Sequence, residues 1–179
     1  MVKLKFPALA LIIVLVFSLA CGCSSSHVKE DTVFDFYNKV QMEQKKEDVD
    51  TALGVNGKES TMLDNCYDYI NQDTGYGVSI LYGDENQVTS KTLLYNSDEE
   101  LASLCNKKVT QKQADSITEK MTYEEIKDLL GGDGIQINST QIPFDDNKAS
   151  FIYIWVNKDG SKLQVVFGTD GTNSTIFFD

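Results

Sequence analysis

The sequence predicts an α+β protein of two tandem helix–helix–β–β–β units, whose antiparallel sheets carry their helices on one face. Two observations predict this fold. Residues 47–54 and 124–131 match at an offset of 77, and each is an amphipathic helical segment that ends in glycine. Each helix is followed by three segments rich in aromatic and β-branched residues, with turn sequences between them.

The elements follow in the same order in both units. The predicted strands are 66–70, 77–82 and 90–95 in the first unit, and 151–156, 162–167 and 174–178 in the second. Apolar residues alternate along the middle strand of each unit, which is the period of a half-buried strand. Thr122 and Glu125 have the spacing of a capping box, which predicts a helix start. Residues 136–148 are interpreted as an insertion in the second unit.

These elements divide the chain into five parts. A leader with a lipid-attachment motif occupies 1–23, a polar tether 24–31, the first unit 32–95, a connector 96–110 and the second unit 111–179. A short helix is expected in the connector around 98–105. The part after the leader is long enough for one domain or two small ones with a sizeable core.

The leader predicts export and attachment to a bacterial membrane by lipid. A short cationic start precedes an uncharged stretch, 6–20, which would rise only about 22 Å as a helix, less than the roughly 30 Å hydrocarbon core. This is the length of a secretory signal. Cys21 and Cys23 each resemble the cysteine of a lipobox, which receives diacylglycerol, and the surrounding glycine and serines favour Cys23. The alternative is an ordinary cleaved signal.

The composition limits the class of partner. Without the leader the chain has 14 lysines against 27 acidic residues, a net charge of −13, and it has no arginine. Nucleic acid is therefore not an expected partner, because its binding requires clustered positive charge. Anionic lipid headgroups are disfavoured for the same reason, so attachment to the membrane depends on acyl chains. We expect a basic or neutral partner.

Candidate catalytic residues are few. The one histidine, His27, lies in the tether, so the domain has no Ser-His or Cys-His pair and lacks the usual transition-metal ligands. The paired carboxylates Asp84-Glu85 and Asp145-Asp146 could support hydrolysis, but no sequence spacing fixes their separation across a cleft. We expect no cofactor, no metal and no enzymatic activity.

Two cysteines lie outside the leader, Cys66 and Cys105. Outside the cell such a pair can form a disulfide. The alternative is two buried free thiols, and the sequence leaves both open because it does not show the distance between the Cα atoms.

The second unit resembles a domain of unknown function found in lipoproteins of Gram-positive bacteria. The resemblance rests on 123–126, 131–134, Tyr153, Trp155 and 165–167. The tandem arrangement resembles the β-lactamase-inhibitor-protein-like fold, and in the first unit Tyr69 stands in the place of Trp155. In that inhibitor the concave sheet face and its loops grip a target protein. The resemblance therefore implies a binding surface, but no inhibitory residues match this sequence.

Alternating aromatic residues provide a candidate binding face: Tyr67 and Tyr69 in the first unit, Tyr153 and Trp155 in the second. Residues two apart on a strand share a face of the sheet. If the aliphatic residues between the rings pack against the helices, the rings line the open face and can anchor a partner. Alternatively the rings are core, and Asp68 between the two tyrosines favours this arrangement in the first unit.

Together these observations predict a lipid-anchored extracytoplasmic protein that binds an unidentified protein or component of the bacterial envelope. The sheet face or the loops would provide the binding surface. Two alternatives remain, a cell-envelope hydrolase that uses paired carboxylates and a structural envelope spacer.

Overall fold

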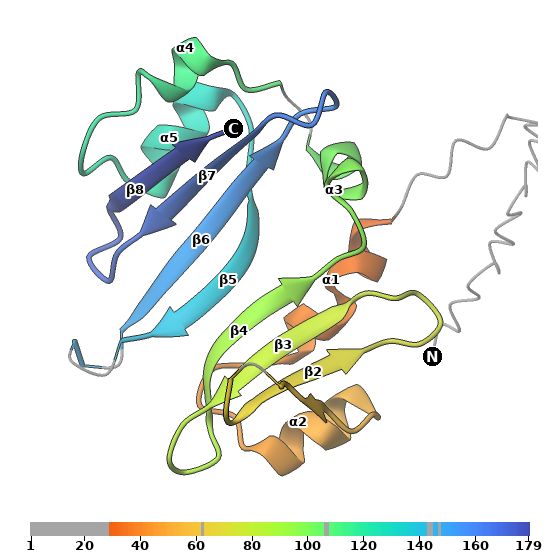
Figure 1. Ribbon diagram of the computed structural model, residues 1–179. Helices are drawn as coiled ribbons and strands as arrows, with labels where there is room; N and C mark the ends of the chain where they lie inside the picture. The colour runs from red at the N-terminus through yellow and green to blue at the C-terminus, as the bar shows by residue number, and fades with distance from the viewer. Residues whose placement is uncertain (1–28, 62, 106–107, 143–144, 147) are drawn as a thin grey trace, which may run out of the picture.

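The computed structural model describes residues 29–179, except 62, 106–107, 143–144 and 147. This part of the chain forms five helices and one open, antiparallel, eight-stranded sheet in the order β1 to β8 (Figure 1). The helices are α1 (Glu30–Lys39), α2 (Lys46–Leu53), α3 (Asp98–Leu104), α4 (Gln111–Ala114) and α5 (Tyr123–Leu130). The strands are β1 (Lys58–Glu59), β2 (Cys66–Ile70), β3 (Gly77–Tyr82), β4 (Val88–Leu94), β5 (Ile135–Gln141), β6 (Ala149–Val156), β7 (Lys162–Phe167) and β8 (Asn173–Phe178).

The α+β class is confirmed, and so are the six predicted strands and the connector helix, α3. The interpretation of 136–148 as an insertion is wrong, because its first six residues belong to the strand β5. Four strands therefore belong to each half, and the two halves share one sheet. The halves are joined where β4 pairs with β5. Thr92 lies opposite Asn138 there, and the two residues before Thr92 pair in the same register. α1 begins at Glu30, inside the segment predicted as tether.

Local sequence explains where two of the helices begin and end. α2 and α5 end at Gly54 and Gly131, whose φ angles of 67° and 77° are left-handed and disfavour residues with a Cβ. α5 begins with the predicted capping box, in which Thr122 and Glu125 bond reciprocally to each other's backbone N–H.

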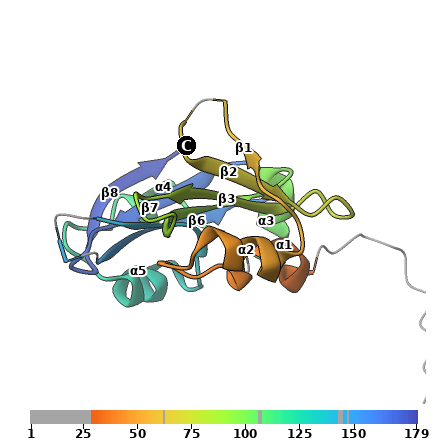
Figure 2. The same cartoon turned by 90° about the horizontal axis from the view of Figure 1, so that it is seen from below.

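The helices lie mainly on one side of the sheet. Figure 2 shows α1, α2 and α5 on the same side, whereas Figure 1 looks onto the other face. Val49 and Leu53 of α2 and Ile126 and Leu130 of α5 are all buried, as the matched helical segments predict. One cluster of buried residues lies under α1 and α2 and a second under α4 and α5. The opposite face of the sheet is the more accessible one, and α3 covers one end of it.

Candidate functional site

The aromatic residues proposed from the sequence lie on the helix-covered face. Tyr69 and Trp155 are 0% and 1% exposed, and Tyr67 and Tyr153 are half-buried against the core clusters. The expectation that the rings of the second unit line an open face is therefore wrong. The physical reason is packing: α5 offers room for large rings, while Ile154 on the other side of β6 is covered by a different helix, α3.

Trp155 is fixed by a hydrogen bond and by close packing. Its indole Nε1–H donates to the carbonyl oxygen of Gly132 at 3.0 Å. Tyr123 stacks on the same ring with centroids 6.3 Å apart. A Cβ on Gly134 would lie only 2.6 Å from Trp155 Cζ2, so this position has no space for a side chain. Trp155 is thus a core residue and not a contact for a partner.

Tyr69 has the equivalent environment in the first half. A Cβ on Gly57 would lie 2.6 Å from Tyr69 Cζ, again too close for a side chain. The Tyr69 hydroxyl donates to Asp50 Oδ1 at 2.7 Å and lies 2.9 Å from the hydroxyl of Tyr82. Burial, together with these hydrogen bonds, raises the pKa of Tyr69, so the phenol stays neutral in the folded protein.

The accessible face is defined by the register of the sheet. Residues directly opposite one another on antiparallel strands share a face. One such row crosses all eight strands, with one residue from each: Lys58, Asp68, Ser79, Thr92, Asn138, Ile152, Val166 and Thr175. Every residue of this row is half-buried or exposed. We call this row, with Ser90, Thr140 and Ser150 beside it, the open face.

Small polar side chains at the centre of the open face form a hydrogen-bond network. Asn138 Nδ2 donates to Thr92 Oγ1 at 2.8 Å, and Thr140 Oγ1 donates to Asn138 Oδ1 at 3.0 Å. Ser90 Oγ lies 2.7 Å from Thr140 Oγ1. The Asn138–Thr92 and Ser90–Thr140 bonds connect β4 to β5, the two strands where the halves of the sheet meet. Hydroxyl and amide groups at this seam can donate to or accept from a partner, and the charged residues of the open face, Lys58 and Asp68, lie away from the seam on β1 and β2.

α3 covers one end of the same side of the sheet. Leu101 and Ala102 of α3 belong to the buried cluster that includes Ile154 and Val156. Cys105 follows the helix, and its sulfur accepts a hydrogen bond from the Val156 N–H at 3.3 Å. Burial raises the pKa of this thiol, which keeps it protonated.

Both cysteines of the described part of the chain are free. Cys66 Sγ lies 3.3 Å from the Ser79 hydroxyl, whereas Cys105 contacts Val156. Cys66 lies in β2 and Cys105 directly follows α3, and the structure contains no disulfide between them.

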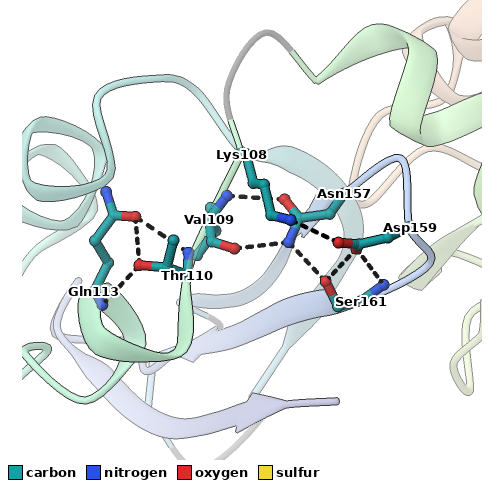
Figure 3. Close-up of polar contacts among 7 residues, drawn as sticks. All are labelled: Lys108, Val109, Thr110, Gln113, Asn157, Asp159 and Ser161. Carbon is teal, nitrogen blue, oxygen red and sulfur yellow. Dashed lines mark hydrogen bonds and ion pairs between the residues drawn. The ribbon is translucent and has the colours of Figure 1, made fainter.

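A group of hydrogen bonds and one ion pair joins the connector to the turn after β6 (Figure 3). Asn157 is 3% exposed, and its side-chain amide bonds to both backbone groups of Val109, at 2.8 and 2.7 Å. Lys108 and Asp159 form an ion pair at 2.7 Å above it. The Lys108 ammonium and the Ser161 hydroxyl lower the pKa of Asp159. Sequence reasoning identified this segment only as a turn, because the partner of Asn157 lies 48 residues away.

A second polar group lies between α1 and the start of β5. Lys91 donates to the carbonyl oxygens of Tyr37 and Val40, at 3.0 and 2.7 Å. Gln136 bridges the hydroxyls of Tyr37 and Tyr153. Lys91 therefore stabilises the carboxyl end of α1, and burial lowers its pKa. The adjoining cavity is about 510 Å³, and Lys91 and Gln136 in its lining already donate hydrogen bonds to Tyr37.

The carboxylate pairs lie in turns and not across a cleft. Asp145 bonds to Thr169 and pairs with Lys148, and the Thr169 hydroxyl lowers its pKa. Asp84 and Glu85 are exposed in the turn between β3 and β4. Among the described residues, no group of three or more His, Cys, Asp or Glu residues could hold a metal ion.

Cys21 and Cys23, the two candidate lipidation sites, lie outside the described residues. Within residues 29–179, no helix is long and apolar enough to cross a membrane.

A comparison with solved structures gives distant structural neighbours, among them one from Bacillus subtilis. The crystal structure of a DUF4309 family protein (YjgB) from Bacillus subtilis matches 80% of this chain and 88% of its own length, with 14% sequence identity and a TM-score of 0.30. A TM-score of this size does not support any transfer of fold or function. No family model and no curated protein match the chain.

Proposed function

We propose that this chain is a lipid-anchored, extracytoplasmic protein of the bacterial envelope that binds another protein through the open face of its sheet. The single observation that carries the proposal is the unequal covering of the sheet. Three helices cover one face, whereas α3 covers only one end of the other, where the row from Lys58 to Thr175 is half-buried or exposed across eight strands. The leader, with Cys21 or Cys23 as the lipidated residue, supports the location.

The chemistry of the open face supports a protein partner. Its centre is made of hydroxyl and amide side chains, with Ile152 and Val166 as apolar neighbours. Such a mixture suits the adaptable hydrogen bonding of a protein interface, in which a small apolar area lies among polar groups. The net charge of −11 for the whole chain favours a basic or neutral partner over an acidic one.

A hydrolase is the weaker alternative. A glycosidase needs one carboxylic acid whose pKa is raised, so that it can donate a proton. Among the described residues, the carboxyl groups with shifted pKa values are all shifted downward, for example Asp133 by Lys127 and Asp170 by the Thr172 backbone. A structural spacer remains the third candidate, and it predicts no specific partner.

We further propose that the two halves are copies of one unit, as the β-lactamase-inhibitor-protein-like resemblance implies. Three matched features support this: α2 and α5 both end in a left-handed glycine, β1 and β5 both follow those helices, and a glycine contacts a buried ring in each half. Gly57 against Tyr69 corresponds to Gly134 against Trp155. The second unit would then carry the domain found in Gram-positive lipoproteins.

Capture from native envelope tests the binding proposal. Thr92→Lys places a long charged side chain at the centre of the open face, and Thr51→Lys makes the same change on the exposed side of α2. We expect Thr92→Lys to reduce recovery of the cross-linked partner severalfold, and Thr51→Lys to leave it unchanged. Equal recovery by the two variants, at equal melting temperature, would exclude the open face as the binding surface.

A further inference from the structure

The two edges of the sheet differ in how they are protected. β1, at one edge, has only two residues, Lys58 and Glu59, and both are charged. β8, at the other edge, has six residues, NSTIFF, without a charge or a proline (Figure 1). Natural proteins protect edge strands by shortening them or by adding charges or proline, since a bare edge pairs readily with another strand. β8 uses none of these three devices. Its first residue is covered, because the Asn173 N–H donates to the Met121 carbonyl oxygen at 2.8 Å and a register shift marks this end of its pairing with β7, so the unprotected part of the edge follows Asn173.

The register shows which backbone groups of β8 point outward. Lys162 and Asp179 exchange both hydrogen bonds, at 3.1 and 3.0 Å, so they form a closely bonded pair. Such pairs alternate along antiparallel strands, and the next is Gln164 with Phe177. The N–H and C=O groups of Ile176 and Phe178 therefore point away from β7. No turn, loop or side chain among the described residues bonds to them.

A cavity of about 440 Å³ lies at the start of β8. Asn173 lines it and is 7% exposed, yet its Oδ1 is buried without a hydrogen-bond partner among the described residues. Glu119 and Asp170 add two carboxylates, and Lys120 is the one cation in the lining. Hydrogen-bond acceptors and a net negative charge suit a cationic donor, such as the side chain of Arg or Lys.

A second cavity, of about 520 Å³, lies at the other end of the strand. Phe177 lines it and is 57% exposed. Five residues separate Asn173 from Phe178, which is a span of about 17 Å in an extended strand. A segment that pairs with the part of β8 after Asn173 would therefore lie beside the Phe177 cavity, and a long side chain at its end could reach the Asn173 cavity.

We propose that β8 docks an extended peptide segment of a partner protein, which adds a ninth, antiparallel strand to the sheet. The outward groups of Ile176 and Phe178 supply the backbone hydrogen bonds. A basic side chain enters the Asn173 cavity, and an apolar side chain covers Phe177. This inference rests on the proposed role in protein binding but concerns a different surface, the edge of the sheet instead of the open face.

Hydrogen–deuterium exchange of the full-length chain in a mild detergent tests the proposal. The probe is a short peptide of alternating Thr and Val that ends in Arg, and its twin ends in Glu. Exchange in 173–179 should slow about tenfold when the free Arg peptide is at about ten times its Kd, because only the unbound edge exchanges. The Glu peptide should bind more weakly.

Variants separate the two contacts. Ile176→Pro removes an outward donor without breaking the ladder to β7 and should abolish the protection, whereas Ile176→Val should retain it. Asn173→Asp should tighten binding of the Arg peptide severalfold and supplies a second test if the proline variant does not fold.

The proposal is overturned if neither peptide protects β8 or if Asn173→Asp has no effect. Protection that rises with protein concentration alone would show that a second copy occupies the edge instead. Protection confined to β4 and β5 would leave the open-face proposal standing without the edge.

Discussion

Substituting Gly134 with alanine tests the packing that turns the aromatic residues inward. The new Cβ would lie 2.6, 2.7 and 2.8 Å from three atoms of the Trp155 ring. The ring has no space to move, because Trp155 is 1% exposed and is bonded to Gly132. Overpacking of this kind costs about 1–3 kcal/mol, and the lower entropy of the unfolded alanine chain offsets about 0.4–1 kcal/mol. We therefore expect the free energy of unfolding to fall by about 1–2 kcal/mol.

Urea unfolding followed by fluorescence measures this change, because Trp155 is the one tryptophan in the chain. Its native emission should be blue-shifted and protected from iodide. Gly168→Ala is the matched control: its Cβ would meet its nearest neighbour at an ordinary 3.4 Å, so stability should stay unchanged or rise slightly. In a Trp155→Phe background, whose unfolding is followed by circular dichroism because no tryptophan remains, the cost of Gly134→Ala should shrink. Equal effects of the two alanine substitutions would refute the assigned packing.

The remaining predictions concern the core, the pH dependence and the anchor. Leu53→Ala and Leu130→Ala should each cost roughly 2–5 kcal/mol in urea unfolding, and costs below about 1 kcal/mol would place both on the surface. Burial raises the pKa of Tyr37 to about 12. The contribution of the neutral phenol to the free energy of unfolding is therefore complete below about pH 10, and it is lost as the pH rises toward 12. Denaturation midpoints should therefore fall between those pH values, and a flat profile would contradict this reasoning. Replacing Cys21 and Cys23 together by alanine should release the protein from membranes or block its processing, whereas full retention at normal size would indicate an uncleaved helix anchor.

Local features of the sequence predicted most of the fold. Gly54 and Gly131 end helices because each local backbone is left-handed, and the capping box at Thr122 acts within four residues. The strand β5 was missed because Ile135 begins a run of Gln, Asn, Ser and Thr, in which few apolar residues alternate. Its pairing with β4 joins residues almost 50 positions apart, and no local pattern encodes such a contact.

The candidate site was harder to predict than the fold. Alternation along β6 correctly separates Trp155 from Ile154, but it does not show which side faces the helices. Tertiary packing decides this, because the rings pack in the cluster with α5 and the aliphatic residues pack in the cluster with α3. The open face depends on the register of eight strands, so Thr92 and Asn138 had no sequence signal that could bring them together.

Site-specific photo-cross-linking in the native envelope tests the binding proposal most directly. A photoreactive residue at Thr92 probes the centre of the open face, and one at Thr51 probes the outer side of α2. We expect a discrete cross-linked protein from Thr92 and none from Thr51. A product from Thr51 alone, or the same products from both positions, would contradict binding through the open face.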